Sequence, residues 1–362
     1  LPTINKKAVE AVLKLGLALN SQIPEISKFD RKNYFYPDLP KGFQISQYQH
    51  PLVKGGEMIL KSGRKIRIRR IHLEEDTAKI IHAKDGALID YNRAGIPLME
   101  LVTEPDIISS EEAGEFSEEL HLLARTLNIS EADMEKGEMR IEANVSVSEN
   151  GKEGTKVEIK NINSFKAVRE AIDYEISRQT EVLKSGGKIT HETRGWDEDC
   201  RETIVQRLKE EAHDYRYFPE PDLLPLDLTK IKEFSIERLR AEIPEIPNQK
   251  RARFAKEYGL KKEQIEIMTR DKRIADFFEK TISELLEWVK EEKDKQNLIN
   301  LGANYLLSDV LGIAKAKEIP FDELLLTPEN FAELLKMMVK NEITSRTAKD
   351  VLLEMIEKGG DA

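Results

Sequence analysis

The chain has 362 residues, of which 40% are hydrophobic and 34% charged, so it is long enough for two or three packed units. Its formal net charge of −10 excludes a protein that coats nucleic acid indiscriminately, although a basic groove can still lie on an acidic body. No run approaches the roughly 20 apolar residues of a membrane span, and the single cysteine, Cys200, excludes an internal disulfide framework and fits the cytoplasm.

The first two thirds of the chain predict mainly short strands. Residues 5–20 place apolar side chains at helical spacing, which predicts an opening helix. From about residue 29 to 240, short runs with a period near two predict strands that begin near residues 57, 65, 87, 138 and 154. Helical spacing interrupts them at 110–127 and at 164–186, where a Gly-Gly pair ends the second helix.

From about residue 241 the spacing becomes helical and stays so. The runs at 251–259, 272–293 and 328–342 carry apolar residues at three- and four-residue steps, and a further helix is expected beyond residue 343. We therefore predict an α+β fold, with a body of antiparallel strands over residues 1–240 and an all-α helical domain over residues 241–362.

The segment 65–76 is the first that suggests chemistry. It is densely basic and ends in three carboxylates. On a regular strand Arg69 shares a face with Glu75, and Arg70 shares the other face with Glu74. Arginines in this setting hold phosphate oxygens while a carboxylate binds the accompanying magnesium. The alternative is an exposed strand of mixed charge.

Two later strands, 139–146 and 155–160, carry polar faces. Carboxylates from neighbouring strands of one sheet can hold Mg²⁺ against ATP phosphates, with basic groups neutralising the transferred phosphoryl group. The alternative is a solvated sheet face. The polar residues of the two strands are Arg140, Glu142, Asn144 and Ser146, then Lys156, Glu158 and Lys160.

Other familiar catalytic patterns are absent from the sequence. It holds no P-loop, no kinase-type glycine loop and no convincing Ser/His/Asp set. Turn-rich segments with Gly and Pro predict rigid loops, whose polar residues line a cleft or staple the turns. Four of the six histidines are scattered, and we expect each of these to be structural: His72, His82, His191 and His213.

The segment DYNRAGIPLMELV, residues 90–102, resembles the signature of the B-subunit family of aspartyl/glutamyl-tRNA(Asn/Gln) amidotransferases, the GatB family. The resemblance runs from Leu1 to about Ala362. Further segments agree in the same order: KFDRKNYFYPD (28–38), QISQY (44–48), HLEED (72–76), TEPDI (103–107), KNINSF (160–165) and DYRYFPEPD (214–222).

The resemblance implies a cradle-shaped catalytic domain similar to glutamine synthetase and guanido kinases. Such an enzyme uses ATP and Mg²⁺ to phosphorylate the side-chain carboxylate of Glu-tRNA(Gln) or Asp-tRNA(Asn). Ammonia from the glutaminase (A) subunit then displaces phosphate, in a heterotrimer that also holds a small (C) subunit. The family also implies a metal-binding first strand and a zinc loop before Leu1, and a YqeY-related tail domain after Ala362, which we expect to lie outside this sequence.

The resemblance, taken with the strand faces, yields a set of expected site residues. The expected metal ligands are Glu75, Glu142 and Glu158, and the expected catalytic residues are Glu75, Arg140 and Lys156. The expected ATP-binding residues are Arg69, Arg70, Lys79, Asn144 and Ser146.

Two other functions remain open at this point. One is a scaffold that holds tRNA and the glutaminase without chemistry, in which neutral substitutions at residues 75, 142 and 158 would be silent. The other is an ATP-dependent ligase for a free small molecule. For the tRNA itself we expect a local basic strip around Lys61, Arg64 and Lys65, together with the helical domain.

Overall fold

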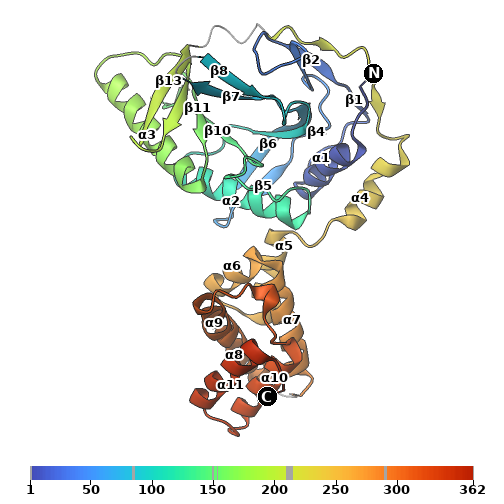
Figure 1. The fold of residues 1–362 in the computed structure, drawn as a ribbon, viewed down its shortest axis with the longest axis vertical. Helices are drawn as coiled ribbons and strands as arrows, with labels where there is room; N and C mark the ends of the chain where they lie inside the picture. The colour runs from blue at the N-terminus through green and yellow to red at the C-terminus, as the bar shows by residue number, and fades with distance from the viewer. Residues whose placement is uncertain are drawn as a thin grey trace. The chain divides into compact units, whose positions relative to one another are not determined.

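The computed structural model describes residues 2–83, 86–148, 151–152, 154–208, 215–288 and 292–361. His213, Asp214 of the last family segment, and residues 289–291 of an expected helix lie outside this part, as does the side chain of His82. The contacts divide the chain into two compact units, Leu1–Ile246 and Pro247–Ala362, so the observed boundary falls a few residues beyond 240 (Figure 1).

The first unit opens with the expected helix, α1 (Lys6–Ala18). The Asn5 side chain caps it by accepting a hydrogen bond from the backbone N–H of Ala8 at 3.2 Å. The apolar face of α1 is buried against β4 (Val53–Lys54) and β6 (Lys65–Glu75). A Cβ on Gly16 would lie 2.6 Å from a methyl carbon of Val53, so glycine permits this close approach.

The sheet that carries the basic segment has the order β4-β6-β5, with β5 at Glu57–Ile59, and β9 (Pro97–Thr103) also pairs with β6. All these pairs are antiparallel. The β6–β9 register shifts between Ile68 and Arg70, which is a β-bulge. Because of it, the buried apolar face passes from Ile66 and Ile68 to Ile71 and Leu73.

Three smaller sheets flank it. One has the order β14-β2-β3, from β14 (Phe218–Pro219), β2 (Asp30–Asn33) and β3 (Phe43–Ser46). This pairing brings the family segment near residue 217 beside the segment near residue 32. The others are two-stranded: β1 (Ile26–Ser27) with β15 (Leu226–Asp227), and β7 (Lys79–Ala83) with β8 (Gly86–Asp90).

The last sheet of this unit is mixed, in the order β10-β11-β12-β13. The prediction of antiparallel strands is wrong for one pair, since β11 (Val157–Ile162) and β12 (Glu192–Asp197) run parallel. Helix α3 (Phe165–Lys184) lies between them in sequence and returns the chain along the sheet, as parallel neighbours require (Figure 1). The outer strands are β10 (Ile141–Val145) and β13 (Glu202–Leu208), and α3 packs on α2 (Ser110–Thr126).

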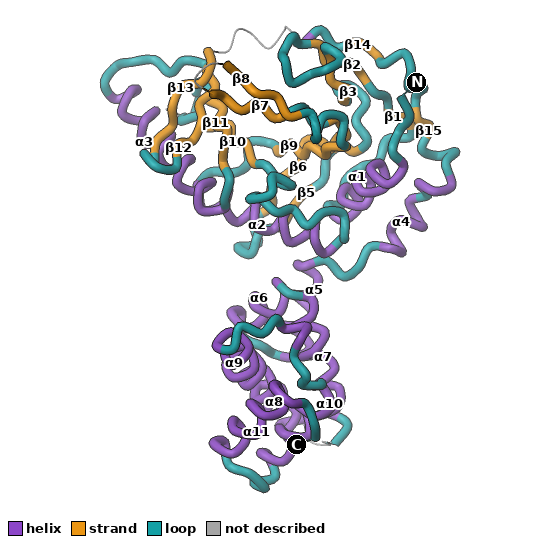
Figure 2. Tube along the Cα trace, in the orientation of Figure 1, coloured by secondary structure: helices purple, strands orange, loops and turns teal. Residues whose placement is uncertain are grey.

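After α4 (Ile236–Glu242), the described part of the second unit contains helices and loops only, as its spacing predicted (Figure 2). Phe254, Phe278 and Phe331 lie in its core. Nowhere in the described ranges does a helix have the length and hydropathy needed to cross a membrane. The helices are α5 (Pro247–Tyr258), α6 (Lys262–Arg270), α7 (Lys272–Leu286), α8 (Glu292–Asn304), η3 (Tyr305–Val310), α9 (Leu311–Ala316), α10 (Pro328–Val339) and α11 (Ser345–Lys358).

Candidate active site

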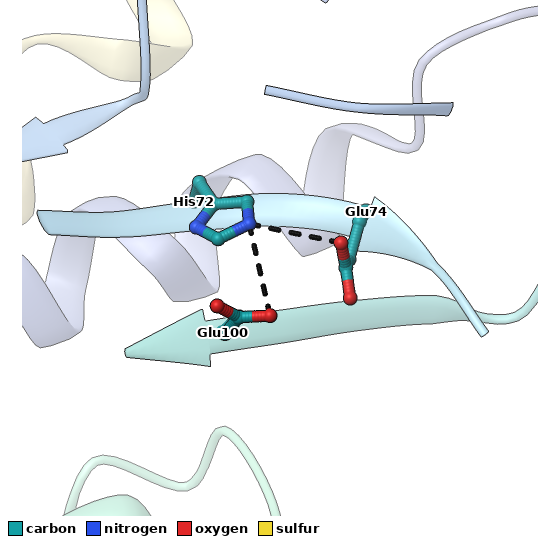
Figure 3. Close-up of side chains that lie close together, drawn as sticks. All are labelled: His72, Glu74 and Glu100. Atoms are coloured by element: carbon teal, nitrogen blue, oxygen red, sulfur yellow. Dashed lines mark ion pairs between the residues drawn. The ribbon is translucent and has the colours of Figure 1, made fainter. Parts of the chain in front are cut away.

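A histidine and two carboxylates meet on the paired strands β6 and β9. His72 lies directly opposite Glu100 in the register, and Glu74 follows on the same face of β6 (Figure 3). The His72 Nε2 atom lies 3.7 Å from a Glu74 oxygen and 4.0 Å from a Glu100 oxygen. His72 and Glu74 are buried, whereas the Glu100 side chain is 45% exposed, so the group opens to solvent on one side.

The surroundings set the charge of this group. Burial raises the pKa of Glu100 above its ordinary value, and the negative charge of Glu74 adds to that shift. Burial would raise the pKa of Glu74 as well, but the neighbouring His72 imidazole, the hydrogen bond from Ser46 and the positive charge of Lys32 outweigh it, so the pKa is lowered. The Ser46 hydroxyl donates to Glu74 at 2.9 Å. The Glu74 carboxylate is therefore ionised at neutral pH.

The same face holds polar atoms that lack protein partners. Among the described residues, His72 Nδ1 and Arg70 Nε are buried without a hydrogen-bond partner, whereas most buried polar atoms in folded proteins have one. The three possible ligand atoms of His72, Glu74 and Glu100 all lie within 4.8 Å of one another. Two carboxylate oxygens and one imidazole nitrogen fit a divalent cation, with the oxygens suited to Mg²⁺.

A row of tyrosines borders the group. Tyr48 and Tyr217 stack with centroids 4.6 Å apart, and Tyr34 meets Tyr215 edge-on at 5.8 Å. Burial, together with nearby carboxylates that include Glu74, raises the pKa of both Tyr34 and Tyr217, so these hydroxyls stay protonated at neutral pH. None of the four rings belongs to a hydrophobic core cluster within the described residues.

Glu75, the expected metal ligand, does not join this group. Adjacent residues of a strand point to opposite faces, and Glu75 points away from Glu74. Its carboxylate instead accepts hydrogen bonds from Lys41 Nζ at 2.6 and 2.7 Å and from the backbone N–H of Ile45 at 3.1 Å. The segment HLEED therefore contributes to the candidate site, but the geometry favours its first glutamate.

The expected ATP-binding residues of the first sheet also separate. Arg70 faces the candidate site, and its positive charge acts on Glu100. Arg69 is directed outward and forms a two-pronged ion pair with Glu104, at 2.7 and 3.1 Å. Lys79 is exposed on β7, and no contact joins it to the group.

The mixed sheet carries a second polar group. Lys160 Nζ lies 2.9 Å from Glu142 and 3.9 Å from Glu158, which also accepts a hydrogen bond from Thr193 at 2.8 Å. Burial lowers the pKa of Lys160, but the two carboxylates raise it more, so the net shift is upward. Glu142 and Glu158 therefore lie together as the strand spacing suggested, although next to a lysine rather than beside Glu75. Of the other residues expected on these strands, Asn144, Ser146 and Lys156 are exposed.

Arg140, an expected catalytic residue, does not join the His72–Glu74–Glu100 group. Its guanidinium forms an ion pair with Asp76, which is also bound by Arg93 Nη2 at 3.0 Å. The Arg93 guanidinium in turn donates to the carbonyl of Gly137 at 2.7 Å. Asp76 thus joins the end of β6, the loop after β8 and the residues before β10.

The expected basic strip is neutralised by acidic neighbours. Arg64 Nε lies 2.9 Å from Glu112, and Lys65 Nζ lies 2.7 Å from Glu57. Lys61 Nζ lies 3.5 Å from Glu119. The strip therefore has little free positive charge, and its contact with tRNA stays a prediction.

Five residues of the candidate site were not expected from the sequence, although all lie in segments that resemble the family: Lys32, His72, Glu74, Glu100 and Tyr217. His72 was expected to be structural, and Glu75 rather than Glu74 was the expected ligand. Lys32, Glu100 and Tyr217 come from different parts of the chain, and strand pairing brings them near His72. A local signal existed for Glu100 alone, as the one carboxylate within the apolar run PLMELV.

Comparison with known proteins first defines the class. The family model described as the GatB/GatE catalytic domain matches residues 1–232, the part that holds this site, and the model described as the GatB domain matches residues 276–362.

Curated relatives narrow the class further. The B subunits of aspartyl/glutamyl-tRNA(Asn/Gln) amidotransferases are 46% identical to this chain in Persephonella marina, 45% in Thermodesulfovibrio yellowstonii and 44% in Brevibacillus brevis. The alignments cover 99–100% of this chain and 74% of each relative. The chain belongs to the GatB family, which confirms the resemblance noted in its sequence.

Proposed function

We propose that this chain is the B subunit of a tRNA-dependent amidotransferase and that its first unit carries the ATP-dependent step. The substrate is the side-chain carboxylate of Glu-tRNA(Gln) or Asp-tRNA(Asn), and the products are the corresponding amides. The observation that carries the proposal is the group His72–Glu74–Glu100, which lies inside the part matched by the catalytic-domain model.

The proposed reaction has two steps. An oxygen of the substrate carboxylate attacks the γ-phosphorus of ATP, the bond from that phosphorus to the β,γ-bridging oxygen breaks, and ADP leaves with the electron pair. Ammonia then attacks the acyl carbon, the bond to the phosphate oxygen breaks, and the nitrogen loses a proton as phosphate departs. In both steps positive groups stabilise charge that develops on phosphate oxygens.

The role of each residue of the candidate site follows from its position. His72, Glu74 and Glu100 would hold a divalent cation such as Mg²⁺, which when bound neutralises phosphate oxygens. Arg70, on the same face, supplies a fixed positive charge next to Glu100. The Tyr217 hydroxyl is protonated and so is available as a hydrogen-bond donor rather than as a base, whereas the Tyr34 hydroxyl, also protonated, donates to Gln44 at 3.5 Å.

Several wider features belong to the same proposal. They are a cradle similar to glutamine synthetase, the glutaminase (A) and small (C) subunits as partners, misacylated tRNA as substrate, and the cytoplasm as compartment. The names of the relatives support an assembly of several subunits. A pure scaffold has no use for a buried carboxylate beside a buried imidazole, and this pair therefore supports chemistry over scaffolding.

The test compares the same substitution at two neighbouring residues. In the assembled complex, with misacylated tRNA and ammonia, ATP-dependent release of ³²P-phosphate is measured for Glu74→Gln and Glu75→Gln. We expect Glu74→Gln to lower the rate by about 100-fold, because it removes a ligand charge from the site, and Glu75→Gln to stay within about threefold of the parent. A large loss of rate for Glu75→Gln with little change for Glu74→Gln would indicate that Glu75 is the metal ligand. If neither variant lowered the rate, the scaffold function would be supported.

A further inference from the structure

Lys32 lies on β2 opposite Gln44 of β3, beside the His72–Glu74–Glu100 group, and has no role in the function proposed so far. Its ammonium lies 4.9 Å from the ring centroid of Tyr215 and 5.7 Å from that of Tyr34. Both distances are within the range of cation–π attraction. The two rings therefore hold the Lys32 side chain without using a carboxylate.

This arrangement sets Lys32 apart from the lysines around it. Lys41 is bound to Glu75 at 2.6 Å, and Lys160 to Glu142 at 2.9 Å. For Lys32, no ion pair within 4.0 Å and no side-chain hydrogen bond is formed with any residue in the described ranges. A cation–π contact leaves the three N–H donors of an ammonium free for another acceptor.

The position of the Lys32 ammonium matters as much as its lack of an ion-pair partner. Lys32 pairs with Gln44 of β3, and Ser46, two residues further along that strand and on the same face, donates a hydrogen bond to Glu74 at 2.9 Å. Lys32 therefore lies on the face of this sheet that meets Glu74, and no ion pair within 4.0 Å joins it to Glu74 or Glu100. A lysine side chain is flexible, and its ammonium here has free donors beside three residues that could bind a metal ion. Such an ammonium suits the binding of a phosphate oxygen.

We propose that Lys32 binds an oxygen of the phosphoryl group that is transferred from ATP, held for that purpose against the rings of Tyr34 and Tyr215. The inference rests on the proposed function, since it names the residue that receives the γ-phosphate. Lys160 is neutralised by Glu142, and the Nε atom of Arg70 is buried, so neither offers the same combination of free donors and open approach.

The test separates binding of the γ-phosphate from binding of the rest of the nucleotide. Equilibrium dissociation constants for a non-hydrolysable ATP analogue and for ADP, each with Mg²⁺, are measured on the assembled complex for the parent, Lys32→Met and Lys32→Arg. Lys28→Met, in the same segment but not next to these rings, is the matched control.

We expect Lys32→Met to weaken binding of the ATP analogue by about tenfold or more while binding of ADP stays within about twofold, because a charge-assisted hydrogen bond to the γ-phosphate is lost. Lys32→Arg should recover part of the loss, and Lys28→Met should match the parent. An equal loss for ADP and the analogue, as a purely structural role would produce, would overturn the proposal, as would no loss at all. Failure of the wider function would instead appear in the parent, as absent phosphate release with misacylated tRNA.

Discussion

The carboxylate of Asp76 should contribute substantially to the stability of the first unit. Its side chain is only 5% exposed, and it accepts hydrogen bonds from Arg93 Nε at 3.1 Å, from Arg140 Nη2 and from the backbone N–H of Thr77 at 2.8 Å. The change Asp76→Asn keeps the volume and the Thr77 contact, but it removes the charge and turns amide hydrogens toward two guanidinium groups.

The expected loss of stability depends on how exposed the two arginine side chains are to solvent. A charge-assisted hydrogen bond is worth about 1.5–3 kcal/mol when buried. The side chains of Arg93 and Arg140 are 38% and 51% exposed, so water recovers about half of each loss. We therefore expect a loss of about 2–3 kcal/mol, which corresponds to a fall in Tm of roughly 5–10 °C for a unit of this size.

Thermal unfolding followed by near-UV circular dichroism at pH 7 measures the change. Asp90→Asn is the control, because Asp90 is exposed and its contacts are with the neighbouring Asn92, so its Tm should stay within about 2 °C of the parent. Equal Tm values for Asp76→Asn and the parent would refute the reasoning that Asp76 fastens these segments.

Two further changes test the electrostatics of the first unit and the core of the second. The pKa of Asp106 is lowered to about 2, mainly by its hydrogen bonds with Arg67, so this pair stabilises the fold above the ordinary Asp pKa and the effect vanishes as pH falls through about 2. Arg67→Gln should therefore be less stable than the parent at pH 5 and equal to it below pH 2 in urea titrations, and a difference that persists in acid would contradict this. Phe278, 1% exposed and 5.3 Å from the Tyr258 ring, fills the core of the helical unit. Phe278→Ala should cost about 3–5 kcal/mol in that unit's unfolding transition seen by calorimetry, and a loss below about 1 kcal/mol would show that the core is not packed as described.

Elements with a long, regular period were predictable from sequence. The helices at 6–18, 110–126 and 165–184 lie where apolar spacing placed them, since one buried face is enough to fix a helix. The parallel pairing of β11 with β12 was not predictable, because periodicity shows which face of a strand is buried and not which strand lies beside it.

The candidate site was located only in part for the same reason. Glu142 and Glu158 lie together because β10 pairs directly with β11, even though the register of this pair shifts between Ile141 and Ala143. Glu100 and Lys32 reach the site through pairing between distant segments, which no local pattern reports. Around Arg69 the simple alternation of faces also fails, because the bulge inserts one extra residue into β6.

Because of this β-bulge, the effect of deleting one residue from β6 depends on which residue is deleted. Arg69 is exposed and its side chain pairs with Glu104, so deleting it removes the extra residue and brings the four buried apolar residues, Ile66, Ile68, Ile71 and Leu73, into one unbroken alternation. Deleting Leu73 instead makes His72 and Glu74 direct neighbours, which must point to opposite faces, and turns the Glu74 carboxylate toward the core. The same change in length is therefore absorbed at residue 69 and dismantles the candidate site at residue 73.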